Sequence, residues 1–410
     1  MLLSFRVVNH RSLRDEQQLN LAPAFDADRP EGTNWPAVPI AAIFGANASG
    51  KSNLIDALLY MRRMVIGSDR ETEPGGGVNR SPFVLDPDTA AQESWFVVDA
   101  VLDGVRYTYG FGVDDSGVTE EWLHRYPVGR RQIVFERKDG DYRFGTTVHE
   151  ELRRISKITP NSVLLMTTAA RFEQADVLPI YIWMRGFGVP AEHYRLFDSE
   201  WIADWMQVGD NRRRTLELLK FADFGIVDVI VRMVGRHAEP LFEMSGAKHN
   251  ARMTLEQQSA GTRTFLTLLP EVLRCLETGS VNVVDELESN LHPNLARHIV
   301  GLFQDPRTNP RAAQLIFTTH NTSLLGSNNE ILKRDQIWFV EKGDQDGATN
   351  LFPLSDFKPR KQESTERRYL GGGYGAVPFI DDALAAEALQ HGPGTDNSDD
   401  ADRPEDDSGE

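Results

Sequence analysis

Eight consecutive residues constrain this chain more than any other feature of its sequence. They run Gly45-Ala46-Asn47-Ala48-Ser49-Gly50-Lys51-Ser52 and fit the pattern G-x-x-x-x-G-K-[ST] of the phosphate-binding loop, or P-loop. Gly45 and Gly50 let the backbone curl so that successive N–H groups face an anion. In this pattern the lysine reaches the β- and γ-phosphates of a nucleotide and the serine holds Mg²⁺. We therefore expect these roles for Lys51 and Ser52.

The residues on either side of the loop supply the context that the pattern needs. Residues 38–44 are apolar and include β-branched side chains, which predicts a buried strand. From Asn53 onward, Leu54, Leu58, Met61 and Val65 recur at helical spacing, which predicts a helix that begins at the loop. Such a helix adds the positive end of its dipole to the anion site. A glycine turn that merely caps a helix is the weaker interpretation in this context.

The charge of the chain is unevenly distributed. The formal net charge is −17 over 410 residues, and residues 381–410 alone hold 11 acids and one base. This tail contains Gly and Pro and almost no apolar residues, so we predict that it is disordered. The rest of the chain is only mildly acidic. A mildly acidic chain is not expected to bind nucleic acid nonspecifically over a broad surface. A local basic groove that binds nucleic acid is the alternative that this charge balance allows.

The sequence does not predict export, membrane insertion or a disulfide. Cys275 is the single cysteine and lies in an apolar helical run, as a small core residue would. No stretch approaches 18 apolar residues, and the first residues do not form a secretory signal. We therefore expect a cytoplasmic protein with no membrane contact and no Cys/His metal site.

The order of the predicted elements indicates an α/β fold of the P-loop NTPase kind. Strands that alternate with helices predict a parallel sheet, formed by residues 1–66 and 251–380. Residues 67–250 are expected to be an inserted lobe. Its first part is an antiparallel meander, with hairpin turns at Asp103-Gly104 and Asp139-Gly140, and its second part is mainly helical. The meander strands are predicted at residues 94–102, 105–113, 121–126, 132–137 and 142–147.

A second hydrophobic strand, at residues 281–284, ends in two acids, Asp285 and Glu286. Hydrolysis of a bound nucleotide needs a second anchor for Mg²⁺ and a group that orients water. Asp285 is expected to hold Mg²⁺ together with Ser52, and Glu286 to polarise the attacking water as the general base. The alternative, two acids that solvate a strand end, is common for an isolated Asp-Glu pair but weaker in a chain that already has a P-loop.

Two further segments contain residue types that a triphosphate requires. Ser259 fits an N-cap before a helix predicted at residues 260–277, and Gly261 lets the backbone come close to an anion. His320 follows a strand predicted at residues 315–319, where its ring is placed to hydrogen-bond the γ-phosphate and hold the water. Taken singly, the first is also explained by a small-residue helix start and the second by a structural histidine.

Taken in order, these segments resemble the ATP-binding-cassette class of P-loop ATPases, and specifically the branch with the chromosome-maintenance (SMC) and RecF-type ATPases. The marks of the family are Asn47 and Asn53 at the P-loop, a signature at Ser259 and Gly261, the acids Asp285 and Glu286, the D-loop stretch at residues 288–293 and the switch histidine His320. The resemblance implies that ATP and Mg²⁺ are sandwiched between two heads. Ser259 and Gly261 would then act in trans, on the nucleotide in the other subunit's P-loop.

Two features depart from the pattern of transport cassettes. Ala260-Gly261-Thr262-Arg263 stands where transporters carry Gly-Gly-Gln, which disfavours a transporter. Gln92 is in the right order for the Q-loop of the family but lies in a polar loop, so the position of the Q-loop stays open.

The C-terminal part of the chain narrows the resemblance. Phe357 and the segment 366–378 look like the closing segment of standalone bacterial ATPases of the AAA, Rlo and overcoming-lysogenisation-defect-like (OLD-like) types, which are linked to phage defence and abortive infection. The resemblance covers about residues 1–380. OLD-like nucleases carry a C-terminal Toprim domain, whereas an acidic tail stands here, so we expect no fused nuclease.

Three functions follow from these observations. The leading hypothesis is an ATP hydrolase that dimerises, or forms a higher oligomer, on ATP and controls a separately encoded nuclease or toxin in antiphage defence. The alternative is a RecF-like DNA-repair ATPase that clamps duplex DNA in a basic groove, for which the candidates are Arg6, Arg11, Arg14 and Arg212–Arg214. A regulatory scaffold that binds ATP without turnover is the third, and Glu286 and His320 weigh against it.

Overall fold

A five-stranded sheet holds the predicted P-loop strand in its middle. The computed structural model describes residues 1–71, 76–188, 199–222, 224–246, 248–326, 331–357 and 364–377, so the predicted disordered tail lies outside the described residues. The strands, in their order across the sheet, are β12 (Val281–Val284), β13 (Gln314–Thr319), β3 (Ile40–Gly45), β14 (Ile337–Lys342) and β15 (Thr349–Pro353). The first four are parallel and β15 is antiparallel to β14, which confirms the predicted parallel sheet.

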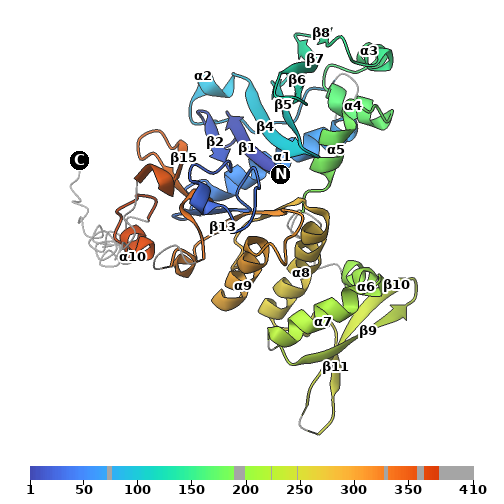
Figure 1. Ribbon diagram of the computed structural model, residues 1–410, viewed down its shortest axis with the longest axis vertical. Helices are drawn as coiled ribbons and strands as arrows, with labels where there is room; N and C mark the ends of the chain where they lie inside the picture. Colours follow the sequence, from blue (N-terminus) through green and yellow to red (C-terminus); the bar gives the residue numbers. More distant parts are fainter. Residues whose placement is uncertain are drawn as a thin grey trace, which may run out of the picture. The chain divides into compact units, whose positions relative to one another are not determined.

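Both faces of this sheet are covered (Figure 1). The helices that cover it are α1 (Lys51–Glu71), α8 (Ala260–Thr278) and α9 (Pro293–Gln304). Because side chains of a strand alternate between faces, Ala41 and Ile43 of β3 join the apolar core that contains α1. Ile40, Ala42 and Phe44 join a second core, which contains α8 and α9. A strand buried on two faces needs an unbroken apolar run, and residues 38–44 provide one.

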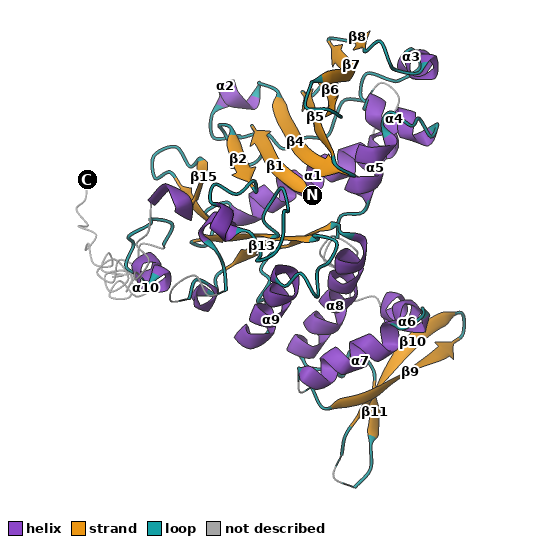
Figure 2. Ribbon diagram, viewed as in Figure 1, coloured by secondary structure: helices purple, strands orange, loops and turns teal. Residues whose placement is uncertain are grey.

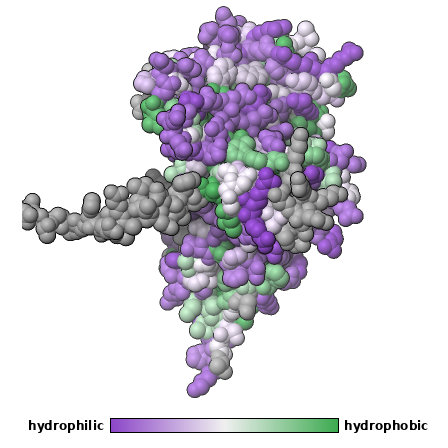
Figure 3. Space-filling view, turned by 90° about the vertical axis from the view of Figure 1, so that its left-hand side faces the viewer, coloured by the Kyte–Doolittle hydropathy of each residue, from purple (hydrophilic) through white to green (hydrophobic). Residues whose placement is uncertain are grey.

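A seven-stranded antiparallel sheet packs on the other side of α1 (Figure 2). In order across the sheet its strands are β2 (Gln17–Asn20), β1 (Leu2–Val8), β4 (Ser94–Leu102), β5 (Val105–Val113), β6 (Val118–Tyr126), β7 (Gln132–Lys138) and β8 (Asp141–Phe144). The turn residues at 103–104 and 139–140 all have φ between 48° and 87°, as a type I′ hairpin requires. Figure 3 shows mostly hydrophilic residues over the upper part of the face that it presents.

The antiparallel sheet crosses the predicted boundary at residue 66. β4, which the sequence analysis assigns to the inserted lobe, pairs with β1 from Val8 opposite Trp95 to Leu2 opposite Ala100. The meander is therefore continuous with the N-terminal strands through backbone hydrogen bonds. The division of the chain at residues 66 and 250 stays a prediction.

A third, smaller sheet is formed by residues that lie, in the sequence, between β3 and β12 of the five-stranded sheet. It consists of β9 (Ile226–Val234), β10 (His237–Met244) and β11 (Ala251–Met253), with α6 (Ser199–Gln207) and α7 (Asn211–Phe221) packed beside it (Figure 2). These strands are absent from the sequence predictions, although residues 226–231 are rich in β-branched side chains. Val229 and Phe242, which face each other across the hairpin, are fully buried and belong to the core with α8.

The remaining helices are short. They are α2 (Pro87–Ala90), α3 (Glu150–Ser156), α4 (Leu165–Arg171), α5 (Leu178–Arg185) and α10 (Thr365–Leu370), with 3₁₀ turns at Asp26–Asp28, Thr322–Leu324, Arg334–Gln336 and Leu354–Phe357. Within the described ranges, none of the helices combines the length and the apolar character that a membrane crossing requires.

Helix α4 joins the P-loop helix to the antiparallel sheet through buried polar contacts. The Thr167 hydroxyl donates to the α1 carbonyl of Val65 at 2.9 Å. At the start of α4, the backbone N–H groups of Leu165 and Met166 donate to the carboxylate of Glu121, at 2.7 and 2.9 Å. Glu121 is fully buried in β6, and burial raises the pKa of its carboxyl. A carboxylate of the sheet thus caps this helix, in place of a side chain of the helix itself.

We predict that Glu121→Ala destabilises the protein by about 3–5 kcal/mol, because it leaves the buried Arg137 guanidinium, 4.0 Å from the carboxylate, without its counter-charge. Urea unfolding measures the loss. The matched control is Glu120→Ala, which removes an ion pair with the exposed Lys138 and should cost much less, because solvent screens such a pair. Equal losses in the two variants would contradict this account of Glu121.

Candidate functional site

The predicted P-loop joins the end of β3 to the first residue of α1. Its two outer glycines are required by close packing. A Cβ on Gly45 would lie 2.4 Å from the Val340 carbonyl oxygen, and a Cβ on Gly50 would lie 2.1 Å from the Thr349 hydroxyl oxygen. Gly50 also has φ of +108°, which side chains disfavour. The loop is therefore pressed against β14 and β15.

Lys51 is buried and folds back over the loop that precedes it. Its Nζ donates to the carbonyl oxygens of Gly45 and Ala46, both at 2.9 Å. Burial lowers the pKa of the Lys51 ammonium, and the carboxylates of the acidic strand end, Asp285 first among them, oppose that shift. The lysine of the P-loop thus lies within the electrostatic field of the acids that the sequence places 234 residues further on.

Two residues outside the motif hold the loop in place. Thr349 donates a hydrogen bond to the Ser49 carbonyl at 2.9 Å, and its hydroxyl lies 2.7 Å from that of Ser12. The Asn53 amide in turn donates to Ser12 at 2.6 Å. Sequence reasoning missed Ser12 and Thr349, because they lie far from the motif in the chain and have no pattern of their own.

The acidic strand β12 is not a neighbour of β3, because β13 lies between them. Thr318 of β13 connects the two acids. Its hydroxyl donates to Asp285 at 2.5 Å and accepts the backbone N–H of Glu286 at 2.7 Å. Glu286 has φ of 50°, an uncommon conformation for a residue other than glycine. The loop after β12 is thereby turned so that Asp285 is half-buried and Glu286 is exposed.

His320 lies at the same edge of the sheet, directly after β13. Its side chain is exposed, and its backbone N–H donates to a carboxylate oxygen of Glu288. In parallel strands the carboxyl ends share one edge, and the P-loop, the two acids and His320 accordingly follow β3, β12 and β13. Ser52, at the start of α1, is exposed there as well.

The signature residues lie at the N-terminus of α8. Ser259 is the N-cap, and its hydroxyl accepts the backbone N–H of Thr262 at 3.2 Å. A Cβ on Gly261 would lie 2.6 Å from the Asn290 carbonyl oxygen, so this glycine is needed where the helix meets the loop after β12. In the part of the chain that the structure describes, no hydrogen bond joins Ser259 to the P-loop.

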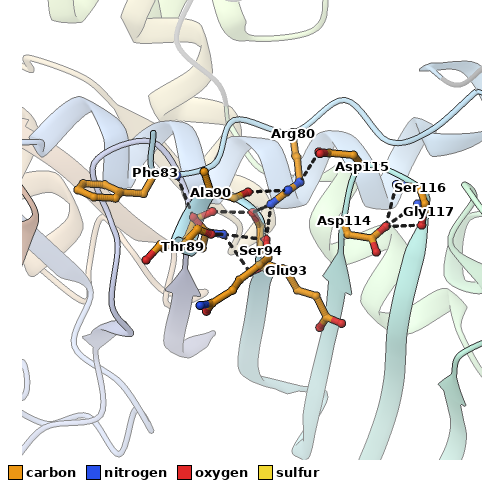
Figure 4. A network of polar contacts seen from close by, with 12 residues as sticks. Arg80, Phe83, Thr89, Ala90, Glu93, Ser94, Asp114, Asp115, Ser116 and Gly117 are labelled. Carbon is orange, nitrogen blue, oxygen red and sulfur yellow. Dashed lines mark hydrogen bonds and ion pairs between the residues drawn. The ribbon is translucent and has the colours of Figure 1, made fainter. Parts of the chain in front are cut away.

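Gln92, a candidate for the Q-loop, takes part through its backbone in a polar network. Figure 4 shows the surroundings of this network at Arg80, Phe83 and Ser94. Its carbonyl accepts from Arg80 at 2.5 Å and from Asn9 at 2.9 Å, while its side chain is exposed. Asn9 also accepts the Phe83 N–H at 2.8 Å. The network fixes the segment around residue 83 against the turn that carries Ser12.

A groove of about 600 Å³ lies next to Asn53 of α1, the end of β14 and the turn before β15. It is lined by Ser12, Asn53, the segment 80–85, Lys342 and Gly347, together with Arg11. Val84 and Leu85 expose 72% and 63% of their surface, so an apolar wall faces this groove. The acids lie on the opposite side of β3, beyond β13.

The arginines that the sequence analysis proposed for a basic groove are all in ion pairs. Near the N-terminus the acidic partners are Asp99 for Arg6, Asp56 for Arg11, and Asp15 and Asp346 for Arg14. On α7 they are Asp228 for Arg212, Asp210 and Glu217 for Arg213, and Glu277 for Arg214. Neither group forms an excess of positive charge.

Comparison with known proteins gives a family match and two structural likenesses. A family model described as "AAA domain, putative AbiEii toxin, Type IV TA system" matches residues 40–326, which include every predicted site residue. The "SMC head domain from Thermotoga maritima" is 17% identical with a TM-score of 0.43, covering 86% of this chain and 98% of that one. An "SmcHead bound to the C-winged helix domain of ScpA" is 15% identical with a TM-score of 0.42, covering 87% and 99%. No curated protein matches the sequence.

We predict that Thr318→Val, which keeps the shape of the side chain, destabilises the protein by about 1–3 kcal/mol, because it removes a buried donor to Asp285 and the acceptor of the Glu286 N–H. Thermal or urea unfolding reports the change. Thr319→Val is the comparison and should cost less, since within the described ranges its buried hydroxyl accepts one hydrogen bond, from the Asn321 N–H. A Thr318→Val protein as stable as the wild type would refute the role of this hydroxyl.

Proposed function

The chain belongs to the family of AAA domains described as putative AbiEii toxin, Type IV TA system, and from this premise we propose that it binds and hydrolyses ATP in a centre that a second copy completes. The observation that carries the proposal is the location of Lys51, Asp285 and Glu286 at one edge of the sheet, where the two carboxylates act on the lysine electrostatically. A phosphate-binding loop and an acidic strand end supply both the anion site and the groups for water attack.

The residues present fit a nucleotide triphosphate with Mg²⁺. The Ser49 hydroxyl is buried inside the loop, and no described residue bonds it. Ser52 is exposed in the first turn of α1, and among the described residues Asp285 accepts a hydrogen bond from Thr318, at Oδ1. Ser52 and Asp285 would hold Mg²⁺, which supplies positive charge beside the phosphates when bound. Lys51 would exchange its two carbonyl partners for phosphate oxygens.

Glu286 is the proposed general base. Its carboxylate takes a proton from water while the water oxygen forms a bond to the γ-phosphorus and the bond to the ADP oxygen breaks, so that ADP and phosphate are the products. His320 is proposed to donate a hydrogen bond to the γ-phosphate. Both side chains are exposed, which leaves them accessible to substrate.

The order of the strands supports a proposed direction for the bound nucleotide. The acids follow β12 and His320 follows β13, so the γ-phosphate belongs on that side of β3. The nucleoside then extends toward β14 and β15, where the groove beside Ser12 and Asn53 lies. Its wall at Val84 and Leu85 offers apolar contact to a base. Pockets of this kind, mostly apolar with a few polar groups, are typical of nucleotide sites.

A second copy is proposed because the signature is not part of the P-loop contacts of its own chain. Ser259 is exposed at the positive end of a 19-residue helix, where an anion is stabilised. By the resemblance stated above, Ser259 and Gly261 act on the nucleotide held by the partner. Loss of the γ-phosphate would then remove the contact that joins the two copies through the bound nucleotide, as in other nucleotide switches.

We propose that the ATPase cycle controls a separately encoded nuclease or toxin in antiphage defence. The family description and the resemblance to OLD-like ATPases support this role. An effector that binds the ATP-bound form and not the nucleotide-free form would support this assignment, and equal binding to both forms would contradict it. The DNA-clamping alternative gains no support from the paired arginines, and measurable ATP turnover would exclude the regulatory scaffold.

We predict that Glu286→Gln lowers turnover by about 10²–10⁴-fold while ATP binding persists and the ATP-bound dimer accumulates. Steady-state phosphate release and sedimentation with ATP measure the two effects. Lys51→Ala is the contrasting variant, because without the ammonium the triphosphate charge is not offset and binding itself should be lost. A Glu286→Gln protein with normal turnover would show that another group is the base.

We predict that Ser259→Arg blocks turnover and ATP-dependent dimerisation but leaves ATP binding by the single subunit intact, because the introduced arginine side chain would lie in the proposed interface between two copies and away from the P-loop of its own chain. The control is Ser245→Arg, an exposed serine after β10, which should hydrolyse ATP normally. Full activity of Ser259→Arg would remove the case for a signature that acts in trans.

A further inference from the structure

The loop that follows β12 is a rigid connection between three parts of the site. Its backbone N–H groups donate to carbonyls at 2.8–3.1 Å, from Leu287 to Thr318, from Ser289 to Glu286 and from Leu291 to Glu288. Glu286 and Asn290 both have positive φ, of 50° and 59°. Such conformations persist only where the surroundings determine them. The hydrogen bonds and the two residues with positive φ therefore fix the course of this loop from Glu286 to Leu291.

Glu288 sits in this loop in an arrangement that stability alone does not explain. One of its carboxylate oxygens accepts the backbone N–H of His320. The other, Oε2, is buried and is bonded by none of the described residues. A buried polar atom without a partner lowers stability, so an apolar residue would suit the fold better. What the Glu288 side chain provides is an oxygen that accepts a hydrogen bond from the residue that faces the substrate.

The far end of the loop meets the signature helix. The Asn290 carbonyl occupies the space where a side chain on Gly261 would lie. Glu288 is two residues from Asn290, and Gly261 is two residues from the N-cap Ser259. His320 and the first turn of α8 are thus connected through one short, hydrogen-bonded segment.

We propose that Glu288 is a positioning residue that holds His320 for the γ-phosphate and couples its position, through Asn290, to the signature at Ser259 and Gly261. The proposal rests on the proposed function, because it assigns a task within that active centre. A change at His320 when the γ-phosphate leaves would move the loop and, with it, the helix end that meets the partner's nucleotide. The two sites of a dimer would then report to one another through Glu288.

The first test compares two substitutions at this position. Glu288→Ala removes the bond to His320, and we expect kcat to fall about 10²-fold, as misplacement of a catalytic group by 1 Å does, with KM for ATP within about threefold of the wild-type value. Glu288→Gln keeps an oxygen that accepts the same N–H, so it should restore kcat to within about threefold of wild type. If Glu288→Gln is as slow as Glu288→Ala, the charge matters and the bond does not, and the proposal is overturned.

A nearby carboxylate provides the matched control. Glu366 accepts the Thr322 hydroxyl at 2.9 Å and so contacts the same segment two residues beyond His320. Glu366→Ala should leave kcat near the wild-type value. An equal loss in Glu366→Ala and Glu288→Ala would mean that any loosening of this segment slows turnover, which also overturns the proposal.

A second measurement does not depend on ATP hydrolysis. In the nucleotide-free protein, amide hydrogen exchange of the peptide that contains His320 should be faster in Glu288→Ala than in wild type, and unchanged in Glu288→Gln, because exchange follows local opening. If the wild-type protein hydrolyses no ATP, the proposed function fails while this measurement still decides whether Glu288 holds His320. Unchanged exchange in Glu288→Ala would show that it does not.

Discussion

Parallel hydrogen bonding from β12 through β13 to β3 is the constraint on which the rest of this structure depends. Val284 pairs with Phe317, and Phe317 pairs with Ala42, so three strands from distant parts of the sequence end at one edge. Because apolar helices cover both faces of the sheet, only the strand ends have access to a ligand. Lys51, Asp285 and His320 owe their common location to this arrangement.

The local part of the site was predictable from sequence. The P-loop carries its own glycines, lysine and serine, and the apolar runs at residues 40–45 and 281–284 identify their strands, because both signals lie within a few residues. The hairpins at 103–104 and 139–140 were predictable for the same reason. In each case a local backbone requirement selects the residue type.

The contacts in the site between residues far apart in the chain were not predictable, because no sequence pattern identifies them. Thr318 bridges Asp285 and Glu286 across a strand boundary, and Thr349 supports the P-loop from 300 residues away. The placement of β13 between β3 and β12 is a property of the sheet and not of any segment. No sequence pattern predicts the hydrogen bond between Glu288 and His320 either, since a glutamate that follows a strand is most often exposed to solvent.

We propose that the groups for turnover are divided between two copies of the chain. The most direct test mixes two inactive variants, Lys51→Ala and Ser259→Arg. In a mixed dimer the intact P-loop of one subunit faces the intact signature of the other, so the account predicts that ATP hydrolysis returns on mixing. If the mixture stays as inactive as its components while mixed dimers form, the active centre is not shared and the claim is wrong.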